Sequence, residues 1–134
     1  MDAETKALVR EMTAASDGER IVFPQVVARL MAAGVERYHA DLIAGEKTYY
    51  MPDGAHEVVA CDRLDRPPAA AFEPAGVKAA VSEIQAGRIG YRAFCARIAE
   101  AGCVGYHVSI AGRRAVYYGR DLDSHVEWFP RSAP

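Results

Sequence analysis

Histidine, carboxylate and hydroxyl side chains recur at alternate positions in two stretches of the chain. If these stretches are strands, alternation brings one set to a single sheet face: His39, Asp41, Glu57, His107, Ser109, His125 and Glu127. A histidine beside a carboxylate can transfer protons near neutral pH, and a tight cluster of such groups can hold a metal ion. This set therefore contains candidates for catalysis or ligand binding.

A wet sheet face explains the same pattern without any chemistry. Antiparallel sheets commonly expose one face to water, and polar residues then alternate with buried ones. Close histidine pairs, such as i and i+4 on a helix, are missing from the sequence, so no metal ligand and no cofactor are predicted. Ser109 follows His107 by two positions, about 6–7 Å along a strand, which is loose for a nucleophile and its base.

The elements that must position these residues follow from an internal repeat. Moving residues 23–58 by 68 positions lays them on residues 91–126 without a gap. Ten of the 36 pairs are then identical, where composition alone would give about three. His39 and His107 form one such pair. We therefore predict two related halves within a single domain.

The halves are expected to be duplicated α-α-β-β-β units, which makes the fold class α+β. We place helices after Asp2, from Pro24 to Gly34, from Pro74 to Gly87 and over 91–101, and strands near 35–43, 46–51, 56–61, 103–111, 114–119 and 124–129. The halves cover about 1–62 and 74–130 of the domain 1–134, with a linker at 63–73. Short turns predict antiparallel sheet with the helices on one face, about a pseudo-twofold axis.

Alternation also predicts which strand residues are buried. In the first strand of the second half, the apolar side chains share one face: Val104, Tyr106, Val108 and Ile110. In the third strand of each half, Val58 with Ala60 and Val126 with Trp128 are assigned to the same buried side. Glu57, His125 and Glu127 then join His39 and His107 on the open face.

Aromatic and basic residues supply further candidates for ligand binding. Tyr49-Tyr50 and Tyr117-Tyr118 are each doubled, so one ring of each pair is buried and the other faces outward. The sequence leaves open which ring of each pair faces outward. The outward rings would wall a small-molecule pocket near the axis, and Tyr50 and Tyr118 are included among the candidates for ligand binding. Arg113, beside a predicted hairpin turn, can grip a phosphate or carboxylate, although a solvated turn explains it equally.

Bulk properties exclude several classes of protein. The net charge of −2 provides no field for nucleic acid or an anionic membrane, and no apolar run approaches a membrane span. The first residues lack the pattern of a signal peptide. Three cysteines without short spacing argue for a reducing compartment, and we expect a cytoplasmic protein.

Two stretches together resemble a known family. The first is Gly34-Val35-Glu36-Arg37-Tyr38-His39-Ala40-Asp41-Leu42, followed by Lys47-Thr48-Tyr49-Tyr50. The second comprises Ile110-Ala111-Gly112-Arg113-Arg114, Tyr117-Tyr118-Gly119-Arg120-Asp121 and His125-Val126-Glu127-Trp128-Phe129-Pro130. These residues are similar to the YbcV/YdfO-like family of small bacterial and prophage-borne proteins. The resemblance implies a compact α+β fold and a prophage association, but no activity and no catalytic residues.

Three hypotheses for the function remain open. The first, which we favour, is a non-enzymatic cytoplasmic module that binds a small molecule or a protein partner through its sheet face or the cleft between halves. The second is an enzyme that uses His39 or His107 with a carboxylate, or a metal, for its chemistry. The third is a homodimer whose exposed sheet face is the interface, in an accessory protein of prophage origin.

Overall fold

The structure is a computed structural model of the chain, and it describes residues 1–130. Its helices and strands are α1 (Ala3–Asp17), α2 (Phe23–Ala32), β1 (Arg37–Asp41), β2 (Glu46–Tyr50), β3 (His56–Ala60), α3 (Pro74–Gln85), α4 (Tyr91–Glu100), β4 (Cys103–Ser109), β5 (Arg114–Gly119) and β6 (Ser124–Trp128). The predicted order of two helices and three strands thus occurs twice. Within this range no helix combines the length and apolar character needed to cross a bilayer.

Local signals in the sequence set the helix ends. The Asp2 carboxylate accepts a hydrogen bond from the Thr5 amide at 2.7 Å and so caps the first turn of α1. Prolines stand in the first turns of α2 and α3, where a missing N–H is tolerated. Gly34 follows α2 with φ +84° and Gly102 follows α4 with φ +86°, the left-handed conformation that ends a helix.

All six strands form one antiparallel sheet in the order β3-β2-β1-β4-β5-β6. Each half contributes a three-stranded meander, as predicted, and the two meanders join through β1 and β4. In that central pair His39 lies directly opposite His107. The α+β class with an antiparallel sheet is therefore confirmed.

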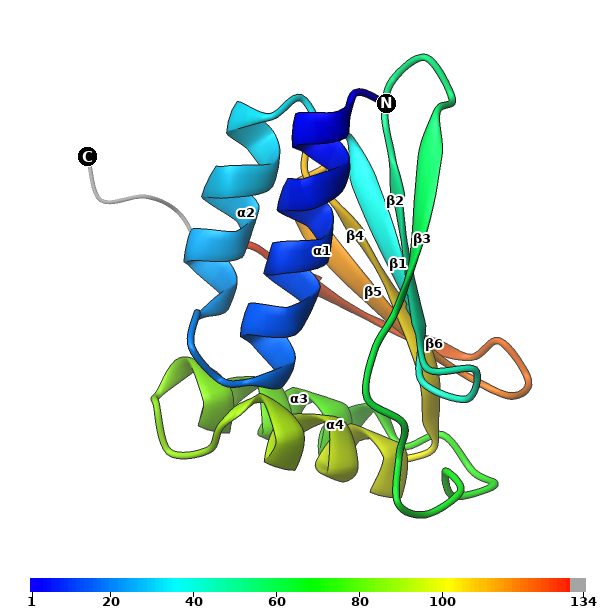
Figure 1. Cartoon of the computed structure of the whole chain (residues 1–134). Helices are drawn as coiled ribbons and strands as arrows, with labels where there is room; N and C mark the ends of the chain where they lie inside the picture. The colour runs from blue at the N-terminus through cyan, green and yellow to red at the C-terminus, as the bar shows by residue number, and fades with distance from the viewer. Residues whose placement is uncertain (131–134) are drawn as a thin grey trace.

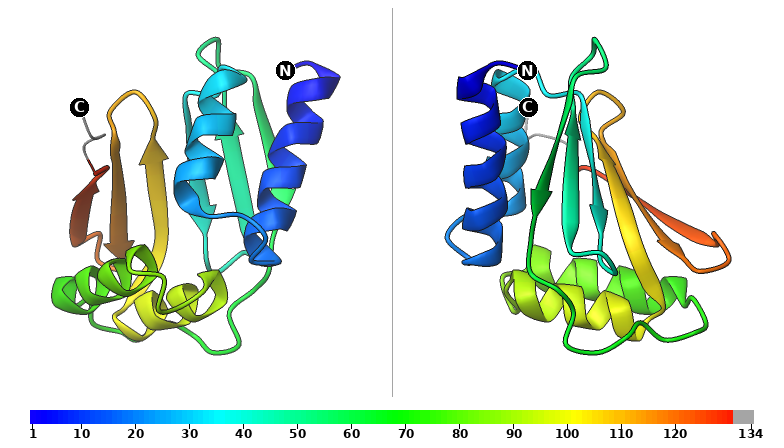
Figure 2. Two further views of the ribbon diagram at one scale, coloured as in Figure 1. Left: turned by 90° about the vertical axis from the view of Figure 1, so that its left-hand side faces the viewer. Right: turned by 45° about the vertical axis from the view of Figure 1, so that its right-hand side comes forward.

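The helices cover one face of the sheet and leave the other face bare (Figures 1 and 2). The covered face buries Tyr38 and Tyr49 of the first half and Tyr106 and Tyr117 of the second. Fully buried helix residues such as Leu30 pack against them. Each such side chain contributes roughly 1.5–3 kcal/mol through burial.

The two helix pairs lie differently on the sheet. The first pair, α1 and α2, runs alongside the strands, whereas α3 and α4 lie across one end of the sheet (Figures 1 and 2). The strands of the two halves are arranged alike, but their helices are not. An internal duplication with a pseudo-twofold axis therefore stays a prediction.

Candidate functional site

His39 and His107 are neighbours on the bare face of the sheet. Their ring centroids lie 4.3 Å apart, and the Tyr118 hydroxyl is 2.6 Å from His39 Nε2. Tyr118 reaches His39 because Gly105 leaves room for its ring: a Cβ atom at position 105 would lie 2.5 Å from the hydroxyl oxygen. The three rings form a small aromatic patch at the centre of this face.

Partial burial lowers the pKa of both histidines. Desolvation lowers the pKa of His39, and the nearby Asp41 carboxylate opposes this. Desolvation also lowers the pKa of His107, with further contributions from His39 and Arg37. Asp41 itself accepts hydrogen bonds from the Ile43 and Ala44 amides, which fixes the turn after β1. Near neutral pH the patch is therefore largely uncharged.

The prediction that Glu57, His125 and Glu127 share this face is wrong. Glu57 pairs with buried Tyr49, and His125 pairs with buried Tyr117, so these side chains lie on the helix-covered face. Glu127 follows His125 on that face, and the two side chains are hydrogen-bonded. The cluster proposed for acid–base chemistry therefore does not assemble.

Apolar side chains at the sheet edges caused this error. Alternation assigns Val58, Ala60, Val126 and Trp128 to the core, yet all four lie on the bare face. Val58, Val126 and Trp128 are 47%, 39% and 60% exposed. On the other side, Glu57 stays polar beneath the helix edge because Arg10 of α1 reaches it at 3.3 Å. At an outer strand, neither face is fully covered, so apolar character does not identify the buried side.

The remaining predicted residues have structural contacts. Ser109 Oγ accepts a hydrogen bond from the Gly112 amide at 2.9 Å, within the turn after β4. Tyr50 faces outward, as Tyr118 does, with the Arg37 guanidinium 3.9 Å from its ring centroid. Arg113 lies in the same turn as Gly112 with φ 53° and points toward the Pro130 carbonyl. Among residues 1–130, no three His, Cys, Asp or Glu side chains are arranged to hold a metal ion.

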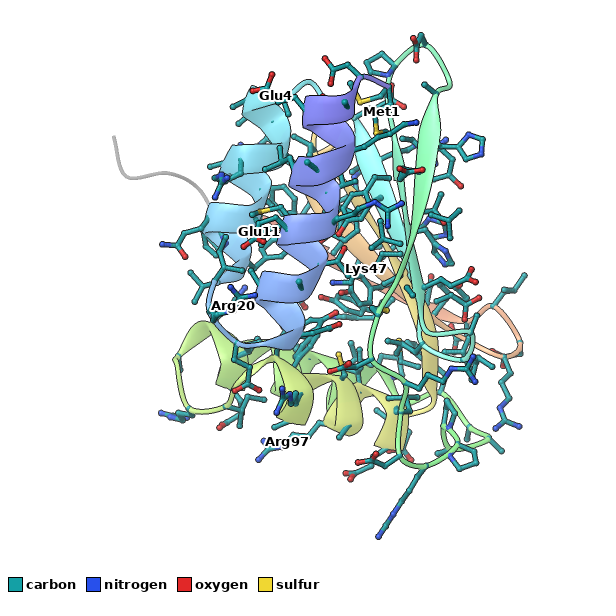
Figure 3. The ribbon with its side chains drawn as sticks, in the orientation of Figure 1. Met1, Glu4, Glu11, Arg20, Lys47 and Arg97 are labelled. Carbon is teal, nitrogen blue, oxygen red and sulfur yellow. The ribbon has the colours of Figure 1, made fainter. Side chains whose placement is uncertain are left out.

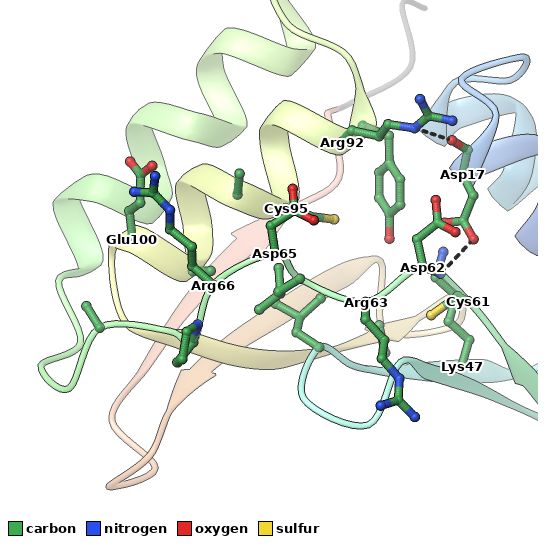
Figure 4. A pocket seen from close by; sticks show the side chains of 18 residues that line it. Asp17, Lys47, Cys61, Asp62, Arg63, Asp65, Arg66, Arg92, Cys95 and Glu100 are labelled. Atoms are coloured by element: carbon green, nitrogen blue, oxygen red, sulfur yellow. Dashed lines mark hydrogen bonds between the residues drawn. The ribbon is translucent and has the colours of Figure 1, made fainter.

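A cavity of about 640 Å³ lies on the opposite, helix-covered side. It opens between α4, the segment that follows β3, and the hairpin end of β1 and β2, where β1 ends and β2 begins (Figure 4). Its lining includes Asp17, Ala40, Leu42, Lys47, Cys61, Asp62, Tyr91, Arg92 and Cys95. We call this cavity the Lys47 pocket. Its volume is in the range of small-molecule sites.

Lys47 is the unusual residue of this pocket. It lies on the covered face of β2, two residues before Tyr49, and is only 3% exposed. Figure 3 shows it between the helices and the sheet, whereas Glu11, Arg20 and Arg97 lie on the outside of the molecule. Within the described part of the chain no carboxylate is within ion-pairing distance of its amino group. Its Nζ lies 4.7 Å from the centroid of the Tyr91 ring.

Burial dominates the electrostatics around Lys47. Desolvation lowers its pKa, while Cys95, Cys61 and Asp17 oppose the shift. Burial raises the pKa of both thiols to about 11, so they are protonated near neutral pH and add little charge. Burial also raises the pKa of Asp17, whose carboxylate accepts a hydrogen bond from the Asp62 amide at 3.0 Å. The amino group therefore has two uncharged thiols beside it, and Asp17 is the carboxyl group whose charge acts on it.

Sequence reasoning missed this pocket, although one signal was present. Strict alternation with Tyr49 places Lys47 on the buried side of its strand, and the position 68 residues later is Ala115, which is buried. A lysine at a core position of a strand is a site candidate in itself, since lysine is almost never fully buried without a partner.

The comparisons with known proteins identify no activity. Residues 69–126 match the model of a family described as a protein of unknown function (DUF1398). The match covers less than half of the chain and runs from the end of the linker into β6. No curated protein matched the chain. The chain is thus similar to an uncharacterised family, and the narrower YbcV/YdfO-like assignment and the prophage association stay predictions.

Proposed function

We propose that this protein is a small-ligand-binding module and that its site is the Lys47 pocket. The observation that carries the proposal is a buried lysine, without an ion-pair partner among residues 1–130, that lines a cavity. Burying such a group without compensation costs several kcal/mol. A ligand oxygen that accepts a hydrogen bond from Nζ would recover part of that free energy.

The surroundings of Lys47 favour a small organic anion. The Tyr91 ring, Leu42 and the two protonated thiols offer apolar contact for a carbon skeleton. Arg92 lies at the end of the pocket that also holds Lys47 (Figure 4). Its Nε donates to the Asp17 carbonyl at 3.0 Å, which leaves its other N–H groups for a ligand carboxylate or phosphate. The ligand would thus bring its anionic group to Arg92 and an oxygen to Lys47.

Thermal unfolding with a panel of small anions tests this proposal. The panel contains acetate, benzoate, pyruvate, 2-oxoglutarate and phosphate. A ligand present at 100 times its Kd stabilises the folded state by about 2.7 kcal/mol, which raises the Tm of a chain of this size by several degrees. We expect at least one anion to stabilise the parent and Lys78→Met, but not Lys47→Met.

Lys78 is the matched control because it is an exposed lysine on α3, away from the pocket. Each Tm is compared with that of the same variant without ligand, since Lys47→Met changes the basal stability. A stabilisation of equal size in all three proteins would contradict the proposal, and so would a panel without any effect on the parent.

A second candidate function is self-association through the bare sheet face, the face that the helices leave uncovered. One end of this face is basic and aromatic, with Arg37, Arg114 and Trp128 in one row across the strands. The other end is acidic, with Asp41 and Glu46. Two copies can pack face to face about a twofold axis that runs parallel to the rows, and so across the strands. This arrangement would place the basic end of each copy over the acidic end of the other. This charge complementarity favours a second copy of the chain as the partner.

The cysteines support a reducing, cytoplasmic setting for either function. All three are free thiols, and two of them, Cys61 and Cys95, line the Lys47 pocket. Secreted small domains commonly rely on disulfides instead. We therefore infer a cytoplasmic module that binds a ligand without metal or cofactor.

A further inference from the structure

We propose that Lys47 forms a reversible imine with the ligand of its pocket, which makes the ligand a small aldehyde or 2-oxo acid with an anionic group. This inference rests on the proposed binding function, since the ligand must first enter the pocket. It goes further because it assigns a covalent step, a nucleophile and a class of reactive compound.

The position of Lys47 meets the main requirement for such a step. An amine attacks a carbonyl carbon only in its neutral form, and exposed lysines are almost entirely protonated near neutral pH. Lys47 is 3% exposed and makes no ion pair with residues 1–130 that would hold its proton. Its lowered pKa acts in the same direction.

The groups that face Lys47 do not compete for the carbonyl carbon. Cys61, after β3, and Cys95, on α4, are protonated near neutral pH because burial raises the pKa of each to about 11. Thiols in this form are poor nucleophiles. The Tyr91 phenol is also protonated, since burial raises its pKa well above the ordinary value. Lys47 is therefore the nucleophile that the pocket offers.

Asp17, a carboxyl group of the pocket whose charge acts on Lys47, can carry the protons that the step moves. The neutral Nζ attacks the carbonyl carbon and forms the N–C bond, while the C=O π bond breaks and one proton passes from the nitrogen to the oxygen. The C–O bond of this carbinolamine then breaks: the oxygen takes a second proton and leaves as water, and the nitrogen gives up its remaining proton as the C=N bond forms. The Asp17 carboxyl group, whose pKa is raised by burial, lies at the same end of the pocket (Figure 4). No oxidant or reductant takes part.

Reductive trapping tests the imine in the full chain. The protein is incubated at pH 7 with 4-formylbenzoate or pyruvate and with sodium cyanoborohydride, which reduces an imine to a stable secondary amine. Peptide mapping by mass spectrometry then gives the modified fraction of each lysine. The chain has three lysines, and Lys6 and Lys78 are exposed internal controls. A lowered pKa raises the fraction of neutral amine, so we expect Lys47 to be modified faster than either control and to carry most of the trapped adduct.

Lys47→Arg keeps the positive charge and the N–H donors but cannot form an imine. We expect this variant to lose the trapped adduct at position 47 while anion binding persists. Equal modification of the three lysines, or modification confined to Lys6 and Lys78, would overturn the imine. If anions stabilise the parent but nothing is trapped at Lys47, the binding function stands and the covalent step fails. If anions have no effect on the parent, the binding function fails first.

Discussion

The buried position of Lys47 gives the protein a stability that depends on pH. Its pKa in the folded state is below the ordinary value of 10.5, which the unfolded chain retains. Between these two values the unfolded chain binds more protons than the folded protein, so the free energy of unfolding rises with pH across this window. At neutral pH, the burial of this amino group therefore lowers the free energy of unfolding.

Replacing Lys47 by methionine removes this dependence. We expect Lys47→Met to raise the free energy of unfolding at pH 7 by about 1 kcal/mol, because a side chain of similar length fills the site without desolvating a charge. The advantage should shrink as the pH approaches 10.5. Urea unfolding at several pH values between 6 and 10 measures it, with Lys78→Met expected to follow the parent. Parallel profiles of Lys47→Met and the parent would contradict the assignment.

At the scale of elements, one buried hydrogen bond joins α1 to β2. The Thr13 hydroxyl donates to the Val9 carbonyl at 2.9 Å, so the Tyr49 hydroxyl must donate the bond of 2.8 Å between the two side chains. Both residues are at most 2% exposed. The bond therefore positions the helix over the sheet where water cannot replace it.

Removing one partner of this hydrogen bond should lower the free energy of unfolding by more than the net contribution of the bond itself. Thr13→Val leaves the Tyr49 hydroxyl buried without an acceptor, and we expect a loss of about 1–3 kcal/mol in urea unfolding. Tyr49→Phe should cost less, since Thr13 keeps its bond to Val9. The double variant should then be less destabilised than the sum of the single ones. Strict additivity would show that the bond does not couple the two elements.

Local signals predicted the elements well because each rests on a few neighbouring residues. Gly34 and Gly102 end helices where expected, and the alternation that buries Tyr106 also places His107 on the open face. The outer strands defeated the same reasoning. Val58 and Trp128 are apolar but face outward, and only pairing with β2 and β5 fixes their side.

The Lys47 pocket was harder to predict because contacts distant in sequence build it. The segment predicted as a plain linker folds back on the helices, where the Ala69 amide donates to the Ala99 carbonyl at 2.9 Å. The Asp62 amide donates to the Asp17 carboxylate at the end of α1. Neither contact leaves a pattern in the local sequence. A buried lysine within an alternating strand was the only local signal of the site.

At the scale of the whole molecule, the four helices of residues 1–130 lie on one side of the six-stranded sheet and leave its other side bare (Figure 2). The middle row of this face is mostly uncharged, with Val58, Thr48, His39, His107, Val116 and Val126 across the six strands. Trp128 adds a ring that is 60% exposed at the basic end, with the Arg114 guanidinium 4.1 Å from its centroid. Apolar area of this kind on a sheet face commonly marks an interaction surface.

A second copy docked on this face makes the mass of the protein in solution depend on concentration. We expect sedimentation equilibrium to give a mass that rises from 14.6 kDa toward twice that value as the protein concentration increases. Val126→Asp places a charge in the middle row and should hold the protein at the monomer mass. Leu122→Asp is the matched control, because Leu122 is 75% exposed in the turn before β6 and outside the face. Salt should weaken the association, since the basic and acidic ends attract across the interface. A parent that stays monomeric at every concentration, or a Val126→Asp variant that associates as strongly as the parent, would exclude this face as a dimer interface.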